Sequence, residues 1–162
     1  MSDAYERSEF WEFAGAAAET VESTYGQVTL FEHGPSHSAS LTGCGVDHAH
    51  THLVPLRFSL EALARLEEPE LRWEDCRVDE VRARANGCEY LYVASDFNGS
   101  STQGSLARLE QPTSQFFRKL IARQTGLAAS WDYKLFPMLE VSSGSAARLR
   151  AQAGATELES AA

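Results

Sequence analysis

The segment Val46-Asp47-His48-Ala49-His50-Thr51-His52-Leu53-Val54-Pro55-Leu56 decides the fold and the chemistry of this chain. Its three histidines alternate with small residues and lead into an apolar pair and a proline. In an extended strand, successive side chains point to opposite faces, so the three imidazoles share one face, about 6.5–7 Å apart at each step. A helix would turn them in three directions. The pattern therefore predicts a β-strand that presents a row of imidazoles.

The histidines of this chain are confined to one short part of the sequence. All five histidines lie between positions 33 and 52, with His33 and His37 preceding the row. No residue after His52 supplies another. We expect His33 and His37 to be solvated loop residues, although either is a candidate for an additional site histidine.

The flanking residues follow helix and strand patterns. Residues 27–33 alternate like a strand that ends at Gly34-Pro35, and a loop over 36–45 joins it to the histidine strand, which we expect to be antiparallel to it. Before this strand, a helix over 8–24 is predicted by an apolar stripe at three- and four-residue spacing, formed by Phe10, Phe13, Ala14, Ala17 and Val21.

The rest of the chain completes one domain. Short helices are predicted over 59–66, 79–85 and 114–125, and strands over 88–95 and 102–109 with a turn at Asn98-Gly99 between them. The last residues are rich in alanine, serine and glycine. We therefore expect a single α+β domain over 1–140, with an antiparallel sheet and flanking helices, and a flexible or loosely helical tail over 141–162.

Composition limits the function classes. The net charge of −9 argues against binding to a nucleic-acid polymer, although a small phosphorylated ligand in a locally positive pocket remains compatible with it. No apolar run approaches the ~18 residues of a membrane-spanning helix. The polar N-terminus does not resemble a signal peptide, and three cysteines without a CxxC pair indicate reduced thiols. We expect a cytoplasmic protein without a membrane partner.

Metal binding is one interpretation of the histidine row. Two histidines two residues apart on a strand can share a zinc ion, and the Asp-x-His-x-His order resembles the first-strand motif of metal-dependent amidohydrolases. Those enzymes are (β/α)₈ barrels of about 250 residues and need further histidines downstream, which this chain lacks. A metal-dependent hydrolase therefore remains the enzyme alternative, and we expect no metal or other cofactor.

Nucleophilic catalysis is the second interpretation. A neutral imidazole nitrogen can attack phosphorus and form a phosphoramidate, which divides one difficult displacement into two easier ones. A neighbouring imidazole can supply the leaving group with a proton. Backbone N–H groups and hydroxyls of a nearby loop can hold the phosphate oxygens. A row of histidines beside a loop rich in glycine, serine and threonine supplies all these parts.

The residues His48-Ala49-His50-Thr51-His52-Leu53-Val54 resemble the His-φ-His-φ-His-φ-φ motif of the histidine triad superfamily of nucleotide hydrolases and transferases. The helix, strand, glycine-containing loop and triad strand over 8–56 agree with that family. Phe31-Glu32-His33-Gly34-Pro35, the stretch 114–119 and Trp131-Asp132 look like a bacterial branch of it. The resemblance implies an antiparallel α+β fold, and action at a nucleotide α-phosphate through a covalent nucleotidyl-histidine intermediate.

The resemblance also implies a role for each site residue. His50 would be the nucleophile, His52 would hydrogen-bond the phosphate and assist the leaving group, and His48 would orient the row. Six further residues would contact the phosphate: Thr42, Gly43, Cys44, Gly45, Gln115 and Arg118. From the residues alone, Gln115 and Arg118 are equally typical of a solvated helix face.

The chain departs from the family before its first helix. Only about seven residues precede that helix, so the family's N-terminal half, which walls the nucleoside pocket, is shortened here. We expect residues 88–109 or a second subunit to build that wall, and we expect a homodimer. The non-enzyme alternative is a nucleotide-binding module that binds but does not turn over its small nucleotide ligand.

Overall fold

The strand-forming segments join in one five-stranded antiparallel sheet with the strand order β2-β1-β4-β5-β3. The computed structural model describes residues 3–37, 40, 42 and 50–160. Its strands are β1 (Val28–Gly34), β2 (His50–Pro55), β3 (Trp73–Arg77), β4 (Glu89–Ala94) and β5 (Gln103–Leu109). Its helices are α1 (Asp3–Tyr25), α2 (Leu60–Glu67), α3 (Val81–Ala85), α4 (Phe116–Gln124) and α5 (Leu139–Ser160), with a 3₁₀ turn, η1 (Val78–Glu80), before α3. The expected α+β class, antiparallel sheet and flanking helices are confirmed.

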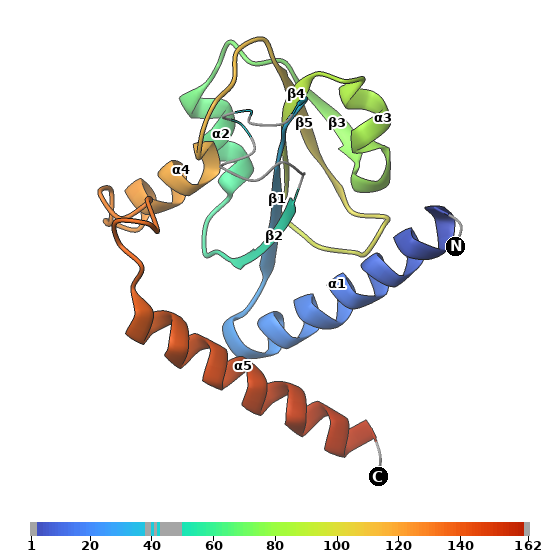
Figure 1. Cartoon of the computed structure of the whole chain (residues 1–162), viewed down its shortest axis with the longest axis vertical. Helices are drawn as coiled ribbons and strands as arrows, with labels where there is room; N and C mark the ends of the chain where they lie inside the picture. Colours follow the sequence, from blue (N-terminus) through green and yellow to red (C-terminus); the bar gives the residue numbers. More distant parts are fainter. Residues whose placement is uncertain (1–2, 38–39, 41, 43–49, 161–162) are drawn as a thin grey trace.

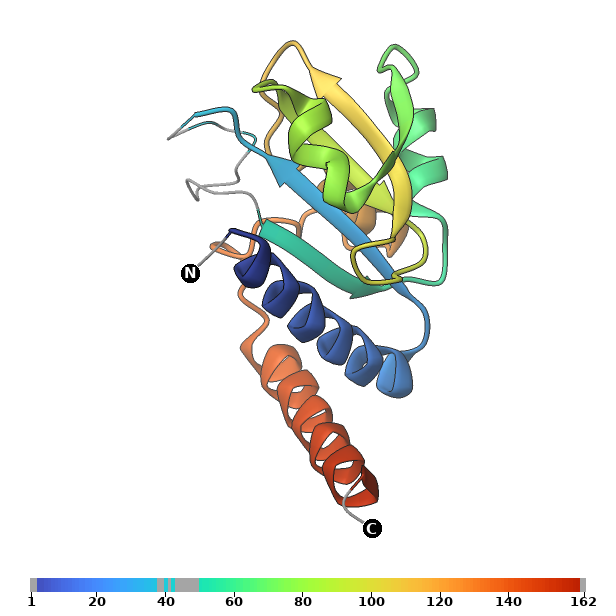
Figure 2. The same cartoon turned by 90° about the vertical axis from the view of Figure 1, so that its right-hand side faces the viewer.

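The histidine segment forms the edge strand β2, which pairs antiparallel with β1 as predicted. In this register Phe31 lies opposite His52, and His33 lies opposite His50. Residues directly opposite each other in antiparallel strands have side chains on the same face, so these four rings belong to one face of the sheet. All six residues of β2 are partly buried. Figure 2 shows β2 at the edge of the sheet, next to α1.

Helices cover both faces of the sheet (Figure 1). On the face of Phe31 and His33, α2 and α4 close a core that includes Leu91, Phe117 and Leu120. On the other face, α1, η1 and α3 cover a second core with Leu30, Tyr90, Tyr92 and Leu106. The histidines of β2 therefore share the face on which α4 lies.

Gly34 is required for the packing of Tyr90. A Cβ at Gly34 would lie 1.9 Å from the Tyr90 ring, so only glycine fits beneath it. The Tyr90 hydroxyl donates to the Glu32 carboxylate, which also accepts from Thr51 Oγ1 at 3.2 Å. Glu32 is thus bound within the sheet, on the face opposite the histidines.

The predicted apolar stripe of α1 is partly wrong. Phe13 is 75% exposed, whereas Ala14 and Ala18 are buried and Trp11 packs against the core. Small alanines let the helix approach the sheet closely, and the large aromatic residue is left outside. The true buried face is rotated from the stripe that hydrophobicity alone suggested.

Strand β3 was not predicted from the sequence. Its residues Trp73-Glu74-Asp75-Cys76-Arg77 are mostly charged, and only Cys76 is buried. Charged side chains are typical of edge strands, where they discourage pairing with other chains. Backbone pairing with β5 and the ion pair between Glu74 and Arg108 hold this strand in place.

The three predicted short helices are present, with ends that differ by at most two residues from the predicted bounds. The Ser59 side chain accepts from the Ala62 N–H at 3.1 Å and caps α2. Asn86 adopts a left-handed conformation (φ 51°) after α3, where it ends the helix. These local signals need no tertiary context.

The C-terminal segment forms the helix α5, which contacts α1 (Figure 1). Leu139 and Val141, near its start, are exposed. The domain boundary at residue 140 stays a prediction. No helix in the described part of the chain combines the length and apolar character needed to cross a bilayer.

Candidate functional site

Four rings gather at the junction of β1 and β2. The ring centroids of His50 and His52 are 4.6 Å apart, and the Phe31 ring stacks on His52 at 4.5 Å with an interplanar angle of 17°. The ring of His33 lies 6.4 Å from that of His52. The predicted alternation therefore brings His50 and His52 together, whereas His48 lies outside the described residues.

His33 belongs to this cluster, and the prediction that it is a solvated loop residue was wrong. It is fully buried, and the Phe117 backbone N–H donates to its Nε2 at 3.3 Å. Burial, and then the nearby charges of His52, His50 and Arg118, lower the pKa of His33 to about 3. The ring is neutral at pH 7, with its proton on Nδ1, which has no hydrogen-bond partner among the described residues. His37 is largely exposed, as expected.

His52 is also held neutral. Partial burial lowers its pKa to about 4, and the neighbouring His50 and Arg118 act in the same direction. A neutral imidazole carries one lone pair and one N–H, so it can accept or donate a hydrogen bond. Because His33 and His52 are uncharged at pH 7, the cluster does not have to accommodate three adjacent positive charges.

Arg118 extends from α4 toward His52 and is fixed by two contacts. Its Nη1 donates to Gln115 Oε1 at 3.2 Å, and its guanidinium carbon lies 4.8 Å from the centroid of the Tyr133 ring. Gln115 is buried and adopts a left-handed conformation (φ 59°) immediately before α4. The structure thus groups Gln115, Arg118 and His52, and the solvated-face interpretation of the first two residues does not hold.

Thr42 is held by a buried carboxylate. Its hydroxyl donates to Glu89, which also accepts from Ser36 and Ser40, and the Thr113 backbone N–H donates to Thr42 Oγ1 at 3.1 Å. Burial raises the pKa of Glu89, but these hydroxyl donors outweigh that effect, and the pKa is lowered overall. Thr42 is therefore bound both to β4, through Glu89, and to the backbone before α4, through Thr113. The predicted phosphate contacts Gly43, Cys44 and Gly45 lie outside the described residues.

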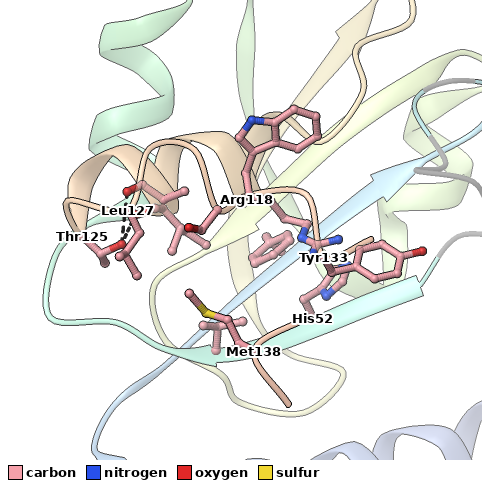
Figure 3. A pocket seen from close by; sticks show the side chains of 12 residues that line it. His52, Arg118, Thr125, Leu127, Tyr133 and Met138 are labelled. Atoms are coloured by element: carbon pink, nitrogen blue, oxygen red, sulfur yellow. Dashed lines mark hydrogen bonds between the residues drawn. The ribbon is translucent and has the colours of Figure 1, made fainter. Parts of the chain in front are cut away.

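A cavity of about 440 Å³ opens beside His52 and Arg118 (Figure 3). Figure 3 shows His52, Arg118 and Tyr133 on one side of it, with Thr125 and Leu127 on the other. It is lined by Phe31, His52, Val54, Arg118, Ile121, Ala122, Thr125, Leu127, Ser130, Trp131, Tyr133 and Met138.

Residues 88–109 contribute no side chain to this cavity, so their expected place in a nucleoside wall, or that of a second subunit, stays a prediction. The lining comes from β1, β2, α4 and the segment 125–138. That segment has no helical or strand periodicity, so only its aromatic residues offered a signal in the sequence. Trp131, which we noted for its resemblance to the triad family, lines the cavity, with the Lys119 ammonium 4.9 Å from its ring centroid.

The described residues contain no group of three or more histidine, cysteine, aspartate or glutamate side chains placed to hold a metal ion. His48, the third histidine of the row, lies outside the described residues. The metal-dependent alternative therefore requires an experimental test.

Comparison with known proteins finds no match: no family model, curated protein or solved structure is significantly similar to this chain. The family suggested by the histidine motif therefore stays a hypothesis.

The two contacts of Arg118 predict that lysine cannot replace it. The planar guanidinium of Arg118 donates to Gln115 and at the same time stacks on the Tyr133 ring, and a lysine ammonium cannot do both. We therefore expect Arg118→Lys to lower kcat/KM for the phosphate-containing substrates proposed below about tenfold. Steady-state kinetics measures this loss. Arg123→Lys is the matched control, because Arg123 lies on the same helix, is half exposed and pairs with the exposed Glu67. Equal activity of the two variants would contradict a role for Arg118.

Proposed function

We propose that this chain is a histidine-triad-like enzyme that hydrolyses or transfers a nucleotide at its α-phosphate through a covalent nucleotidyl-His50 intermediate. The observation that carries the proposal is the pairing of His50 and His52 on one strand face, with Arg118 fixed beside them at a cavity. His50 would supply the nucleophile, the neutral His52 would supply an N–H that hydrogen-bonds the leaving group, and the guanidinium would supply positive charge for the phosphate oxygens.

The reaction would proceed in two displacements. A ring nitrogen of His50 forms a bond to the α-phosphorus as the bond to the leaving group breaks, and an imidazole N–H of His52 supports the departing atom. Water then attacks the phosphorus and the P–N bond breaks, which releases a nucleoside monophosphate and regenerates His50. If another acceptor replaces water, the same intermediate gives a transfer reaction.

The other predicted residues have supporting roles in this proposal. Arg118, oriented by Gln115, would neutralise the charge that builds up on the phosphate oxygens. His48 would orient His50, and Gly43, Cys44 and Gly45 would contact the phosphate. Thr42 would act indirectly, because its hydroxyl already binds Glu89 and Thr113, and would hold the loop in position.

A homodimer is part of the proposal. In the described part of the chain, no strand pairs with the outer edge of β2, which carries the histidines. An edge strand can pair with a strand of another chain. We propose that a second copy of the chain lies against this edge.

A turnover panel tests the function and separates it from the metal-dependent alternative. The chelator-treated protein is incubated with a dinucleoside polyphosphate, a nucleotide phosphoramidate and a nucleoside diphosphate sugar, and released nucleoside monophosphate is measured by chromatography. We expect release from at least one substrate at the same rate with and without chelator. Loss of activity on chelation and its recovery with zinc would instead favour the metal-dependent hydrolase. Binding without release from any substrate would favour the non-catalytic module.

A further inference from the structure

The cavity beside His52 differs chemically from the phosphate site that it joins. Its lining includes the aromatic rings of Phe31, Trp131 and Tyr133 and the aliphatic side chains of Val54, Ile121 and Leu127. Among the described residues, Arg118 and His52 are the only basic side chains that line it, and no aspartate or glutamate does so. The cavity therefore combines one cationic end with an apolar body.

The hydrogen-bonding capacity of the apolar body is small. The Thr125 hydroxyl already donates to the Ile121 carbonyl oxygen at 2.9 Å. The hydroxyls of Ser130 and Tyr133 are the other side-chain oxygens in the lining. A group inside this cavity gains from burial and from contact with flat rings, and little from pairing of its polar edges.

The aromatic walls are attached to α4 by cations. The Arg118 guanidinium covers the Tyr133 ring, and the Lys119 ammonium covers the Trp131 ring. Consecutive residues of one helix thus hold both rings of the segment that follows it. The same arginine faces the phosphate site, so the position of the rings is coupled to that of the phosphate-binding group.

We propose that this cavity binds the base of the substrate nucleotide, by stacking and burial, while the phosphate lies at His50, His52 and Arg118. This inference rests on the proposed function for the position of the phosphate. Because few lining groups can form hydrogen bonds with the polar edges of a base, the site accepts different purines with similar affinity. The base wall of this chain is thus α4 together with residues 125–138.

Equilibrium binding to the full chain tests the inference without any chemical step. Isothermal calorimetry compares AMP, GMP and ribose 5-phosphate, which share the phosphate and differ in the base. We expect AMP and GMP to bind within about threefold of each other, and both to bind at least about tenfold more tightly than ribose 5-phosphate.

Two exposed leucines give a matched pair of variants. Leu127 is 49% exposed and lines the cavity, whereas Leu135 is 72% exposed and does not. Leu127→Ala should weaken AMP binding about fivefold and leave ribose 5-phosphate binding unchanged, and Leu135→Ala should change neither. Both substitutions lie at the surface, so folding should be retained, which thermal unfolding verifies.

The outcomes separate this inference from the proposed function. Equal binding of AMP and ribose 5-phosphate, or equal effects of the two leucine variants, would overturn the assignment of the cavity even if His50 is the nucleophile. Base-dependent binding that is lost in Leu127→Ala would support it even if no turnover is found. A preference of more than about tenfold between AMP and GMP would overturn the claim that the cavity does not distinguish bases by hydrogen bonds to their edges.

Discussion

Replacing His50 with asparagine is expected to lower turnover of any nucleotide substrate by at least about 10³-fold. The substitution removes the nitrogen that would form the bond to phosphorus. Among the described residues, His50 is the only histidine that lies opposite His33 in the sheet, so no other imidazole occupies its position. His50 is only partly buried on an edge strand, so the fold should tolerate the change. Steady-state kinetics measures the loss, and urea unfolding shows that the variant is folded.

The matched control for this prediction is His37→Asn. His37 is a histidine from the same region, but its side chain is 67% exposed and lies at Glu89. We expect its substitution to change turnover less than about twofold. Full activity of the His50 variant would contradict the proposed mechanism, and an equal loss in both variants would show that the effect is not specific to the nucleophile.

Acid should destabilise the protein strongly, and His33 should account for a large part of this effect. Between pH 6.5 and 4 the unfolded chain protonates His33 and His52, but the folded chain does not, because their pKa values there are about 3 and about 4. The unfolded state then binds more protons, so the free energy of unfolding falls as the pH is lowered. The expected loss is a few kcal/mol, since each such group contributes up to about 1.4 kcal/mol per pH unit.

Urea unfolding at several pH values between 7.5 and 4.5 measures this dependence. His33→Gln removes one titrating group, and its amide oxygen can still accept the Phe117 N–H, so the fall in stability on acidification should become shallower. His37→Gln, at the exposed histidine, should keep the slope of the wild-type chain. An unchanged slope in His33→Gln would show that His33 is not held neutral by burial.

The sequence predicted the elements whose signals are local. Ser59 before α2, Asn86 after α3 and the alternation that begins at His50 each fix a conformation through neighbouring residues. Strand β3 was missed because its charged side chains reflect its position at a sheet edge, which depends on the pairing with β5. The buried face of α1 was misjudged because the close approach of Ala14 and Ala18 to the sheet outweighs the hydrophobicity of Phe13.

Alternation alone predicted the part of the candidate site that lies on β2. Alternation in a strand necessarily puts His50 and His52 on one face, and the resemblance to the triad family drew attention to Gln115 and Arg118. The place of His33 depends on its register opposite His50 and on the backbone of Phe117, which is 84 residues away. The cavity wall depends on the contacts of Arg118 with Tyr133 and of Lys119 with Trp131. No periodic pattern in the sequence predicts such contacts.

The central claim is that His50 forms a covalent bond to a nucleotide phosphate. The most direct measurement is intact-mass spectrometry of the protein after brief incubation with the nucleotide panel, followed by peptide mapping of any adduct at neutral pH. The account predicts a mass increase of one nucleotidyl group, located on His50 and absent in His50→Asn. An adduct that persists in His50→Asn, or turnover by the wild-type chain without any adduct on His50, would contradict it.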